Sequence, residues 1–254
     1  MRRALRWLAL VAVAAVALQL FFVVRIAAMA VFDPQSTAFQ RSEAWRLATE
    51  GPAPAGKGKA APAWHWRQQW VPYAQIADHL KRAVIASEDA GFREHDGVDW
   101  ESLEKAWEKN EKAQASASRQ AQVAPGKAAR AARIVGGSTI TQQLAKNLFL
   151  SGERTLLRKG QEFVLTLLLE ALLSKQRILE IYLNSVEWGE GVFGAEAAAQ
   201  RYFGKSAARL SAAESARLAV MLPRPRFFEQ RPQSGYLASR TQTIMARMGD
   251  AVLP

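Results

Sequence analysis

The N-terminal segment is apolar over a length sufficient to cross a membrane, and this constrains the fold more than any other feature. Trp7 to Val24 is almost wholly apolar, and a second apolar run, Ile26 to Phe32, follows Arg25. A bilayer needs about 20 such residues, whereas the hydrophobic region of a signal peptide has roughly 7–15. We therefore predict a retained transmembrane anchor over residues 7–32. The alternative is a secretory signal removed near Ala28-Met29-Ala30, which imitates a cleavage site.

The charges around this segment predict its orientation. Arg2, Arg3 and Arg6 precede it, so residues 1–6 are expected in the cytoplasm and the chain after Arg25 on the outer side. The chain has 34 Lys and Arg against 23 Asp and Glu, and its net charge of +11 favours anionic partners. Most of that charge would lie outside the cell, which argues against a nucleic-acid partner. Cysteine is absent, so there is neither a disulfide framework nor a thiolate metal site.

The rest of the chain is predicted to be a stalk followed by one mainly α-helical domain. Residues 33–63 are expected to form a membrane-proximal stalk and linker, because Gly51–Ala63 has three prolines, three glycines and no large apolar side chain. Residues 64–254 have helical apolar spacing and few strand signals, so they are expected to form the domain. The domain begins with an aromatic-rich stretch, Trp64–Tyr73. We expect this stretch to form an edge strand or a wall of the core, and the alternative is contact with sugars or lipid.

A basic segment interrupts the domain. Lys109–Arg133 contains six Lys and Arg, one Glu and a single large apolar residue, Val123. Such a composition forms either a solvated helix or a disordered stretch. We interpret residues 109–133 as a flexible basic insertion.

A glycine-bracketed acidic segment is the first candidate site. The helical run Ile76–Ser87 leads into Glu88 and Asp89, and the segment Gly91–Gly97 follows with several more titratable groups. Burying so many titratable groups is costly, and a solvated surface does not need them, so the density suggests chemistry. The alternative is a charged helix end followed by an Asp96-Gly97 turn.

A second candidate site lies at a helix start. Thr139 and Gln142 form a capping-box pattern after a Gly-Gly turn, which predicts a helix through Phe149. The unpaired N–H groups at such a helix start can bind a phosphate. The alternative is an ordinary capped helix.

A third candidate is an acid at the polar start of an apolar helix. The helix expected over residues 154–173 is apolar nearly all round, which predicts burial in the domain centre. Glu162 follows Arg158 by one turn, so the two can pair. The pair is either a simple helix-start ion pair or a second functional acid in a semi-buried cationic site. Two carboxylates from separate segments, as Glu88 and Glu162 are, are typical of glycosyl chemistry.

Four stretches in this order resemble the peptidoglycan glycosyltransferases, which are the glycosyltransferase domains of bifunctional penicillin-binding proteins and their monofunctional relatives. The stretches are Ile85-Ala86-Ser87-Glu88-Asp89-x-x-Phe92-x-x-His95-x-Gly97-x-Asp99, Gly137-Ser138-Thr139-Ile140-Thr141-Gln142-Gln143, Arg158-Lys159-x-x-Glu162 and Lys175-x-x-Ile178-Leu179-Glu180-x-Tyr182-Leu183-Asn184. The resemblance covers roughly residues 64–228. The chain resembles the monofunctional, membrane-anchored form of the family, because no segment as long as a penicillin-binding domain follows Pro254.

The resemblance implies a lysozyme-like, two-lobed helical domain behind the anchor, with the smaller lobe dipping into the membrane. It implies polymerisation of lipid II, the undecaprenyl-diphosphate-linked disaccharide-peptide, into β-1,4-linked glycan strands by inverting displacement of the lipid diphosphate. The enzyme would sit in the inner membrane with its catalytic domain in the periplasm. Cell division proteins or cell-wall synthases are candidate partners beside lipid II and the nascent glycan.

The resemblance also assigns roles to residues. Glu88 would be the base that deprotonates the acceptor 4-hydroxyl, and Glu162 the second essential acid. Lys146 and Arg154 match cationic positions linked to the diphosphate and to sugar orientation. The expected substrate-binding set is Asp89, Phe92, His95, Ser138, Thr139, Gln142, Gln143, Lys146, Arg154, Arg158, Lys159 and Asn184. Of these, His95 is expected to hydrogen-bond within its own loop. No cofactor is required, and a divalent cation, Mg or Mn, is an option at the substrate diphosphate.

Three positions depart from the family pattern. Gly91 stands where family members often carry a basic residue, which removes one expected phosphate contact and leaves Arg93 as a substitute. The segment 109–133 is longer than the usual connection, and Arg224 stands where a smaller polar residue is expected.

Two alternative functions remain from the sequence alone. A lysozyme-like lytic hydrolase would also use a catalytic Glu but would need neither the cations nor an anchor. A non-enzymatic membrane-tethered scaffold would not need both acids. Metal hydrolysis is the weakest option, because the three histidines are scattered along the chain.

Overall fold

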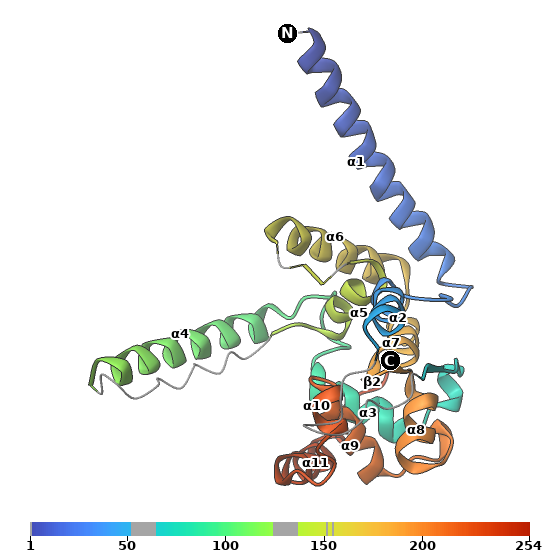
Figure 1. The fold of residues 1–254 in the computed structure, drawn as a ribbon, viewed down its shortest axis with the longest axis vertical. Helices are drawn as coiled ribbons and strands as arrows, with labels where there is room; N and C mark the ends of the chain where they lie inside the picture. Colours follow the sequence, from blue (N-terminus) through green and yellow to red (C-terminus); the bar gives the residue numbers. More distant parts are fainter. Residues whose placement is uncertain (1, 52–64, 124–136, 151, 154) are drawn as a thin grey trace.

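The computed structural model describes residues 2–51, 65–123, 137–150, 152–153 and 155–254, and of residues 117–123 the backbone only. Most of the expected linker, residues 124–133 of the basic insertion and Arg154 lie outside the described residues. Within the described part the chain is mainly helical and two-lobed, as the sequence predicts (Figure 1).

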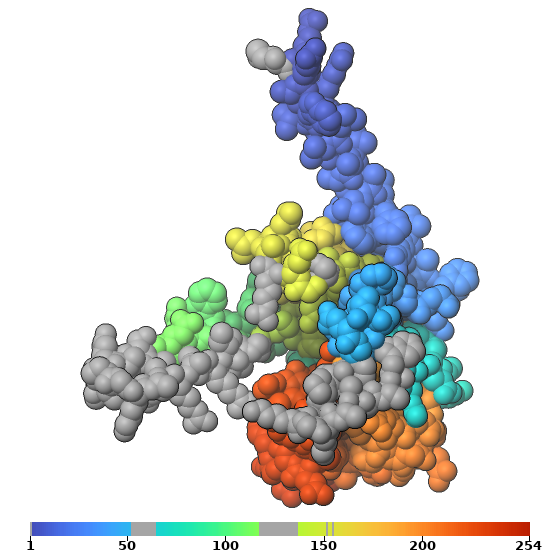
Figure 2. All heavy atoms as spheres, viewed as in Figure 1, coloured from blue at the N-terminus to red at the C-terminus, as the bar shows by residue number. Residues whose placement is uncertain are grey.

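Helix α1, Arg2–Ala28, projects from the body of the protein as an isolated rod (Figures 1 and 2). Its most apolar window has a mean hydropathy of 2.6 and none of that window is buried, so α1 is long and apolar enough to cross a membrane. The helix ends at Ala28 and the chain then turns, so residues 29–32 of the expected span 7–32 lie past the helix.

The last turns of α1 pack on the domain. Ile26 and Met29 are buried in the main core, and Arg25 lies over the ring of Phe149, 5.6 Å from its centroid. Gln19 donates a hydrogen bond to Gln161 at 3.0 Å. These contacts fix the lower end of the apolar helix against one lobe of the domain.

The upper lobe in Figure 1 packs around a capped helix. Its elements are α2 (Ala38–Glu50), α5 (Ile140–Phe149) and α6 (Leu156–Leu172). Thr139 caps α5 by accepting from the Gln142 N–H, while the Gln142 side chain accepts from the Thr139 N–H. This reciprocal pair satisfies two of the donors left free at a helix start. The predicted capping box and the predicted extent of the helix are both confirmed.

The lower lobe is built on α3 and two C-terminal helices. Its elements are η1 (Tyr73–Gln75), α3 (Asp78–Glu88), α8 (Ala195–Phe203), η2 (Ala207–Arg209), α9 (Ala212–Met221), α10 (Pro225–Glu229) and α11 (Gly235–Arg247). Helices α3, α9 and α11 pack against one another. Helix α7, Lys175–Ser185, contacts both α5 and α8, and so joins the two lobes.

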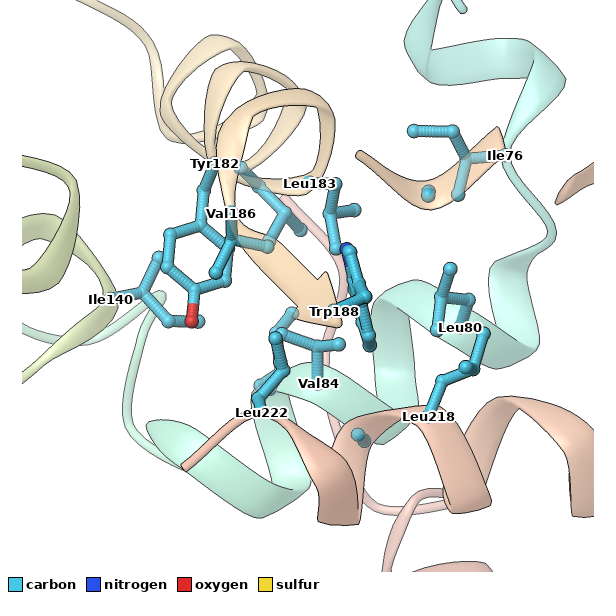
Figure 3. Packing of buried hydrophobic residues seen from close by; sticks show 14 of the residues in the cluster. Ile76, Leu80, Val84, Ile140, Tyr182, Leu183, Val186, Trp188, Leu218 and Leu222 are labelled. Carbon is cyan, nitrogen blue, oxygen red and sulfur yellow. The ribbon is translucent and has the colours of Figure 1, made fainter. Parts of the chain in front are cut away.

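The core of the lower lobe forms where α3, α7 and α9 meet (Figure 3). Leu80 and Val84 of α3 face Leu218 of α9, and Trp188 fills the space between them and α7; all four side chains are fully buried. Burying a side chain of this size contributes about 1.5–3 kcal/mol. The end of α3, which carries Glu88, is therefore held on a rigid base.

The glycine-rich stretch after α7 forms two short strands. β2 (Glu187–Gly189) pairs antiparallel with β3 (Val192–Phe193), and β1 (Arg67–Gln68) adds a parallel edge to β3. The strands are only two or three residues long, which is too short to produce a periodic signal. The edge strand expected in the aromatic stretch is confirmed at β1.

Helix α6 is not buried in the domain centre, and this prediction is wrong. Leu165 and Leu169 are fully buried, but Leu156 and Leu157 are 93% and 87% exposed, and Phe163 is also exposed. The helix packs mainly on α5 and α1 and also contacts α7, and these neighbours leave the apolar side chains named above exposed.

Helix α4, Trp100–Val123, extends away from the body (Figure 1). It includes the first part of the basic insertion, so residues 109–123 are helical, and most side chains of residues 109–116 are exposed. Trp100 and Trp107 are 65% and 67% exposed at its base.

Candidate active site

Glu88 is the last residue of α3 and lies half-buried at the junction of the two lobes. Its Oε2 accepts a hydrogen bond from Nε2 of Gln143 in α5 at 3.1 Å. Burial raises the pKa of the Glu88 carboxyl, and the nearby charge of Asp89 raises it further, while hydrogen bonds from Gln143 and Ser87 act in the opposite direction. A carboxylate with a raised pKa can accept a proton near neutral pH.

Asp89 connects the acidic segment to the start of α5. Its Oδ2 accepts from the N–H of Ile140 at 2.9 Å, and its Oδ1 lies 2.8 Å from Nε2 of His95. The Gly97 N–H donates to Nδ1 of His95 at 3.1 Å, so Nε2 carries the proton donated to Asp89. His95 thus hydrogen-bonds within its own loop, as expected, and Asp89 has a positioning role.

Gly97 closes this loop against the upper lobe. The Thr139 hydroxyl donates to the Gly97 carbonyl at 2.6 Å. The glycine has φ +87°, and an added Cβ would lie 2.7 Å from Cγ2 of Thr166. Only glycine fits this left-handed position so close to α6. The acidic segment and the start of α5 are therefore held together by hydrogen bonds between side chains and backbone.

Glu162 lies in a cationic cluster on the inner side of α6. Its Oε2 accepts from Arg158 at 2.7 Å and its Oε1 from Lys159, and the carboxylate is 5% exposed. Burial lowers the pKa of the nearby Lys146, while the Glu162 charge raises it. The predicted ion pair of Arg158 with Glu162 is present, and cations bind both oxygens of this buried carboxylate.

Two open pockets adjoin at the Glu88–Gln143 hydrogen bond. The first, about 360 Å³, is lined by Gln143, Lys146 and Arg158 among others. The second, about 410 Å³, is lined by Glu88 and Ser138 and by residues of α4 and α11. The arrangement separates a base on one side from a pair of cations on the other.

The predicted site residues fall into three groups. Those that line a pocket are Glu88, Asp89, Ser138, Thr139, Gln143, Lys146 and Arg158. Glu162, Lys159, Gln142 and His95 hold these residues in place through the contacts above. Arg154 lies outside the described residues.

Phe92 and Asn184 form a third group, and their positions correct the expectation of substrate contact. Phe92 is fully buried beneath the ammonium of Lys175, which lies 4.7 Å from the ring centroid. Asn184 is also fully buried; it donates to the Val71 carbonyl and accepts from the Val71 N–H. Both therefore support the fold behind the site and line neither pocket.

Sequence reasoning missed four residues that border the pockets or the base. Tyr182 donates to Oε1 of Gln143 at 2.9 Å and so orients its amide. Glu187 lines the first pocket, and burial raises its pKa to about 7. Arg240 and Arg247 of α11 line the second pocket. The arginines are seven residues apart and share one side of a helix, which is the only sequence signal they carry.

A metal held by the protein does not fit the described residues. Among them, no group of three or more His, Asp or Glu side chains comes together as a possible metal site. The Glu162 carboxylate, the acid nearest the cations, is already paired twice. A divalent cation at the substrate diphosphate stays a prediction.

Comparisons with known proteins agree with the motifs. The family described as Transglycosylase matches residues 57–249. A biosynthetic peptidoglycan transglycosylase of Burkholderia pseudomallei is 53% identical over 253 residues, 98% of this chain and 88% of the relative. Proteins of the same description from Herminiimonas arsenicoxydans and Paraburkholderia xenovorans are 51% and 49% identical, covering 100% and 98% of this chain and 99% and 94% of their own lengths.

Proposed function

The chain belongs to the transglycosylase family, and on that basis we propose that it polymerises lipid II into β-1,4-linked glycan strands for cell-wall synthesis. The observation that carries the proposal is the placement of Glu88 and the cations Lys146 and Arg158 on opposite sides of Gln143. A displacement with inversion needs a base and a leaving-group site that face each other across the reacting carbon.

In the proposed reaction Glu88 accepts the proton of the acceptor 4-hydroxyl. The oxygen then forms a bond to the anomeric carbon of the donor sugar, and the bond from that carbon to the lipid diphosphate breaks. The electron pair leaves on the diphosphate oxygen. Lys146 and Arg158 stabilise the developing negative charge there, so the leaving group needs no general acid.

Glu162 acts in this proposal by positioning the cations. Its two oxygens hold Arg158 and Lys159 and its charge favours the protonated form of Lys146. Without it, three cations would repel one another beside the substrate. These residue roles require no metal ion held by the protein, and any divalent cation would arrive with the diphosphate.

The uncovered apolar surfaces support a position at the membrane. Helix α1 has the length and composition of a membrane span, and Gln19 within it contacts Gln161 of α6. The exposed Leu156 and Leu157 lie at the start of α6 and would then meet lipid. Arg2, Arg3 and Arg6 favour a cytoplasmic N-terminus, with the domain in the periplasm at the inner membrane. Cell-division or cell-wall synthase proteins are candidate partners at this membrane.

The deciding experiment supplies purified full-length protein with lipid II in detergent and measures glycan polymer. Wild type should polymerise, and Glu88→Gln, which keeps the shape but cannot accept the proton, should be slower by about 10²–10⁴-fold. Wild-type turnover by Glu88→Gln would refute the base assignment. Shortening of preformed glycan by wild type would instead support a lytic hydrolase. Binding of lipid II without any turnover would support a non-enzymatic scaffold.

A further inference from the structure

Two arginines of the C-terminal helix border the pocket that contains Glu88. Arg240 and Arg247 of α11 both line it, although they lie beyond the four sequence stretches that carry the family resemblance. Leu237 and Ile244 of the same helix are buried in the core. Burial of Leu237 and Ile244 fixes the rotation of α11 about its axis. Each arginine follows one of these residues by three positions, so both arginines lie along the rim of the pocket.

Neither arginine side chain is held by a partner within the described residues: the guanidinium groups of Arg240 and Arg247 make no ion pair and no hydrogen bond there. Arg240 acts on Glu88 only through its charge, which lowers the pKa of that carboxyl. Ion pairs do hold arginines elsewhere in the chain: Arg177 pairs with Glu180 at 2.8 Å and Arg226 with Glu187 at 2.8 Å. Two unpaired guanidinium groups in one pocket form a site for an anion, since guanidinium binds carboxylate or phosphate with two parallel hydrogen bonds.

A further cation of the pocket comes from α4. Lys105 and Lys109 line the pocket, but Lys105 is paired with Glu101 at 2.5 Å, so only Lys109 adds to the charge of the arginines. Each acid of the pocket accepts a hydrogen bond from another group: Asp89 from Ile140, Asp99 from the N–H of Ser102 at 2.8 Å, and Glu88 from Gln143 at 3.1 Å. Gly91, where a cation of the family pattern is missing, also lines this pocket.

The position of α11 indicates which anion arrives here. Helix α11 lies at the end of the molecule opposite the free end of α1 (Figure 1). A lipid-linked diphosphate stays at the membrane surface, close to α1 and α6. Helix α11 forms the part of the pocket wall that lies farthest from α1, so it would meet the part of the substrate that projects away from that surface.

We propose that Arg240 and Arg247 form a subsite that binds a carboxylate of the peptide attached to the substrate sugar. The subsite rests on the proposed function, because only that function places a carboxylate-bearing glycopeptide beside Glu88. With this subsite the enzyme would recognise the peptide of the substrate as well as its sugar and its diphosphate.

The test measures binding of a soluble disaccharide-peptide to the full chain in detergent by titration NMR. The probe is used in two forms, one with free peptide carboxylates and one with these carboxylates converted to amides. Wild type should bind the free form about tenfold more tightly, the factor expected for one charge-assisted contact. The double variant Arg240→Gln/Arg247→Gln should bind both forms equally weakly. Arg209→Gln, an exposed arginine of η2, is the matched control and should behave as wild type.

Binding that is equal for the two probes in wild type would overturn the proposal. The amidated probe should bind the double variant as it binds wild type. If it lost as much affinity as the free probe, the proposal would also be overturned, because the arginines would then recognise another group. The polymerisation assay with Glu88→Gln is independent of this result, so failure of the subsite and failure of the proposed function can be told apart. KM for the free and amidated forms of lipid II gives a second readout, since Arg240 also lowers the pKa of Glu88 and can change kcat alone.

Discussion

The hydrogen bond from Gln143 to Glu88 should set the pH at which the base becomes active. Gln143→Met removes the donor that lies 3.1 Å from Oε2 while keeping a side chain of similar length. That donor favours the charged carboxylate, and its loss leaves burial as the dominant influence, so the pKa of Glu88 should rise further. The base must be ionised to act, and the acid limb of the pH–rate profile should therefore move to higher pH.

The size of this change follows from the type of bond. A hydrogen bond to a charged group contributes about 1.5–3 kcal/mol, and about 1.4 kcal/mol corresponds to one pH unit. Removal should therefore shift the acid limb upward by about one pH unit or more. The same substitution leaves the buried hydroxyl of Tyr182 without its acceptor, at a cost of about 1–3 kcal/mol in stability.

The assay is kcat/KM for polymer formation measured from pH 4 to pH 9, with thermal unfolding alongside. Tyr182→Phe is the matched control, because it removes the hydroxyl but keeps the Gln143 donor, and its acid limb should stay near that of wild type. The double variant Gln143→Met/Tyr182→Phe should recover stability while retaining the shifted limb. An acid limb unchanged in Gln143→Met would refute the assignment of Glu88 as the titrating base.

Two further predictions concern buried polar groups near the site. Asn184→Ala removes three hydrogen bonds, to the Val71 N–H, the Val71 carbonyl and the Glu180 carbonyl, and should lower the free energy of unfolding by about 2–4 kcal/mol in denaturant titrations, with KM for lipid II unchanged. Glu187 has its pKa raised by burial to about 7, so between pH 4.5 and 7 the folded state binds more protons than the unfolded state and stability should fall as pH rises. Glu187→Gln should remove that dependence, and a slope equal to wild type would show that another group is responsible.

The sequence predicted the helix starts because the relevant interactions are local. A capping box involves residues three positions apart, and the Thr139–Gln142 box forms as predicted. The ion pair of Arg158 with Glu162 spans one helical turn and was predictable for the same reason.

Contacts between distant segments were not predictable in this way. Asn184 belongs to a recognisable motif, but its partner, Val71, lies 113 positions away and shares no pattern with it. Arg240 and Arg247 become pocket residues only because α11 packs on α3. Motif membership therefore identified which residues matter near the site, and only the fold separated those lining a pocket from those supporting it.

The apolar side chains of α6 predicted a helix buried in the domain centre, but the structure leaves many of them exposed. Arg158, Glu162 and Leu165 follow one another at helical spacing and face the domain, while Leu156 and Phe163 face outward. A helix apolar on both sides is expected in a protein core only if protein surrounds it, and lipid can take the place of protein on one side. Under the proposed function, the cations that stabilise the diphosphate would then lie within one turn of residues in the bilayer. A lipid diphosphate could bind Arg158 without its hydrocarbon chain leaving the membrane, which explains how one short helix can serve both the chemistry and the anchoring.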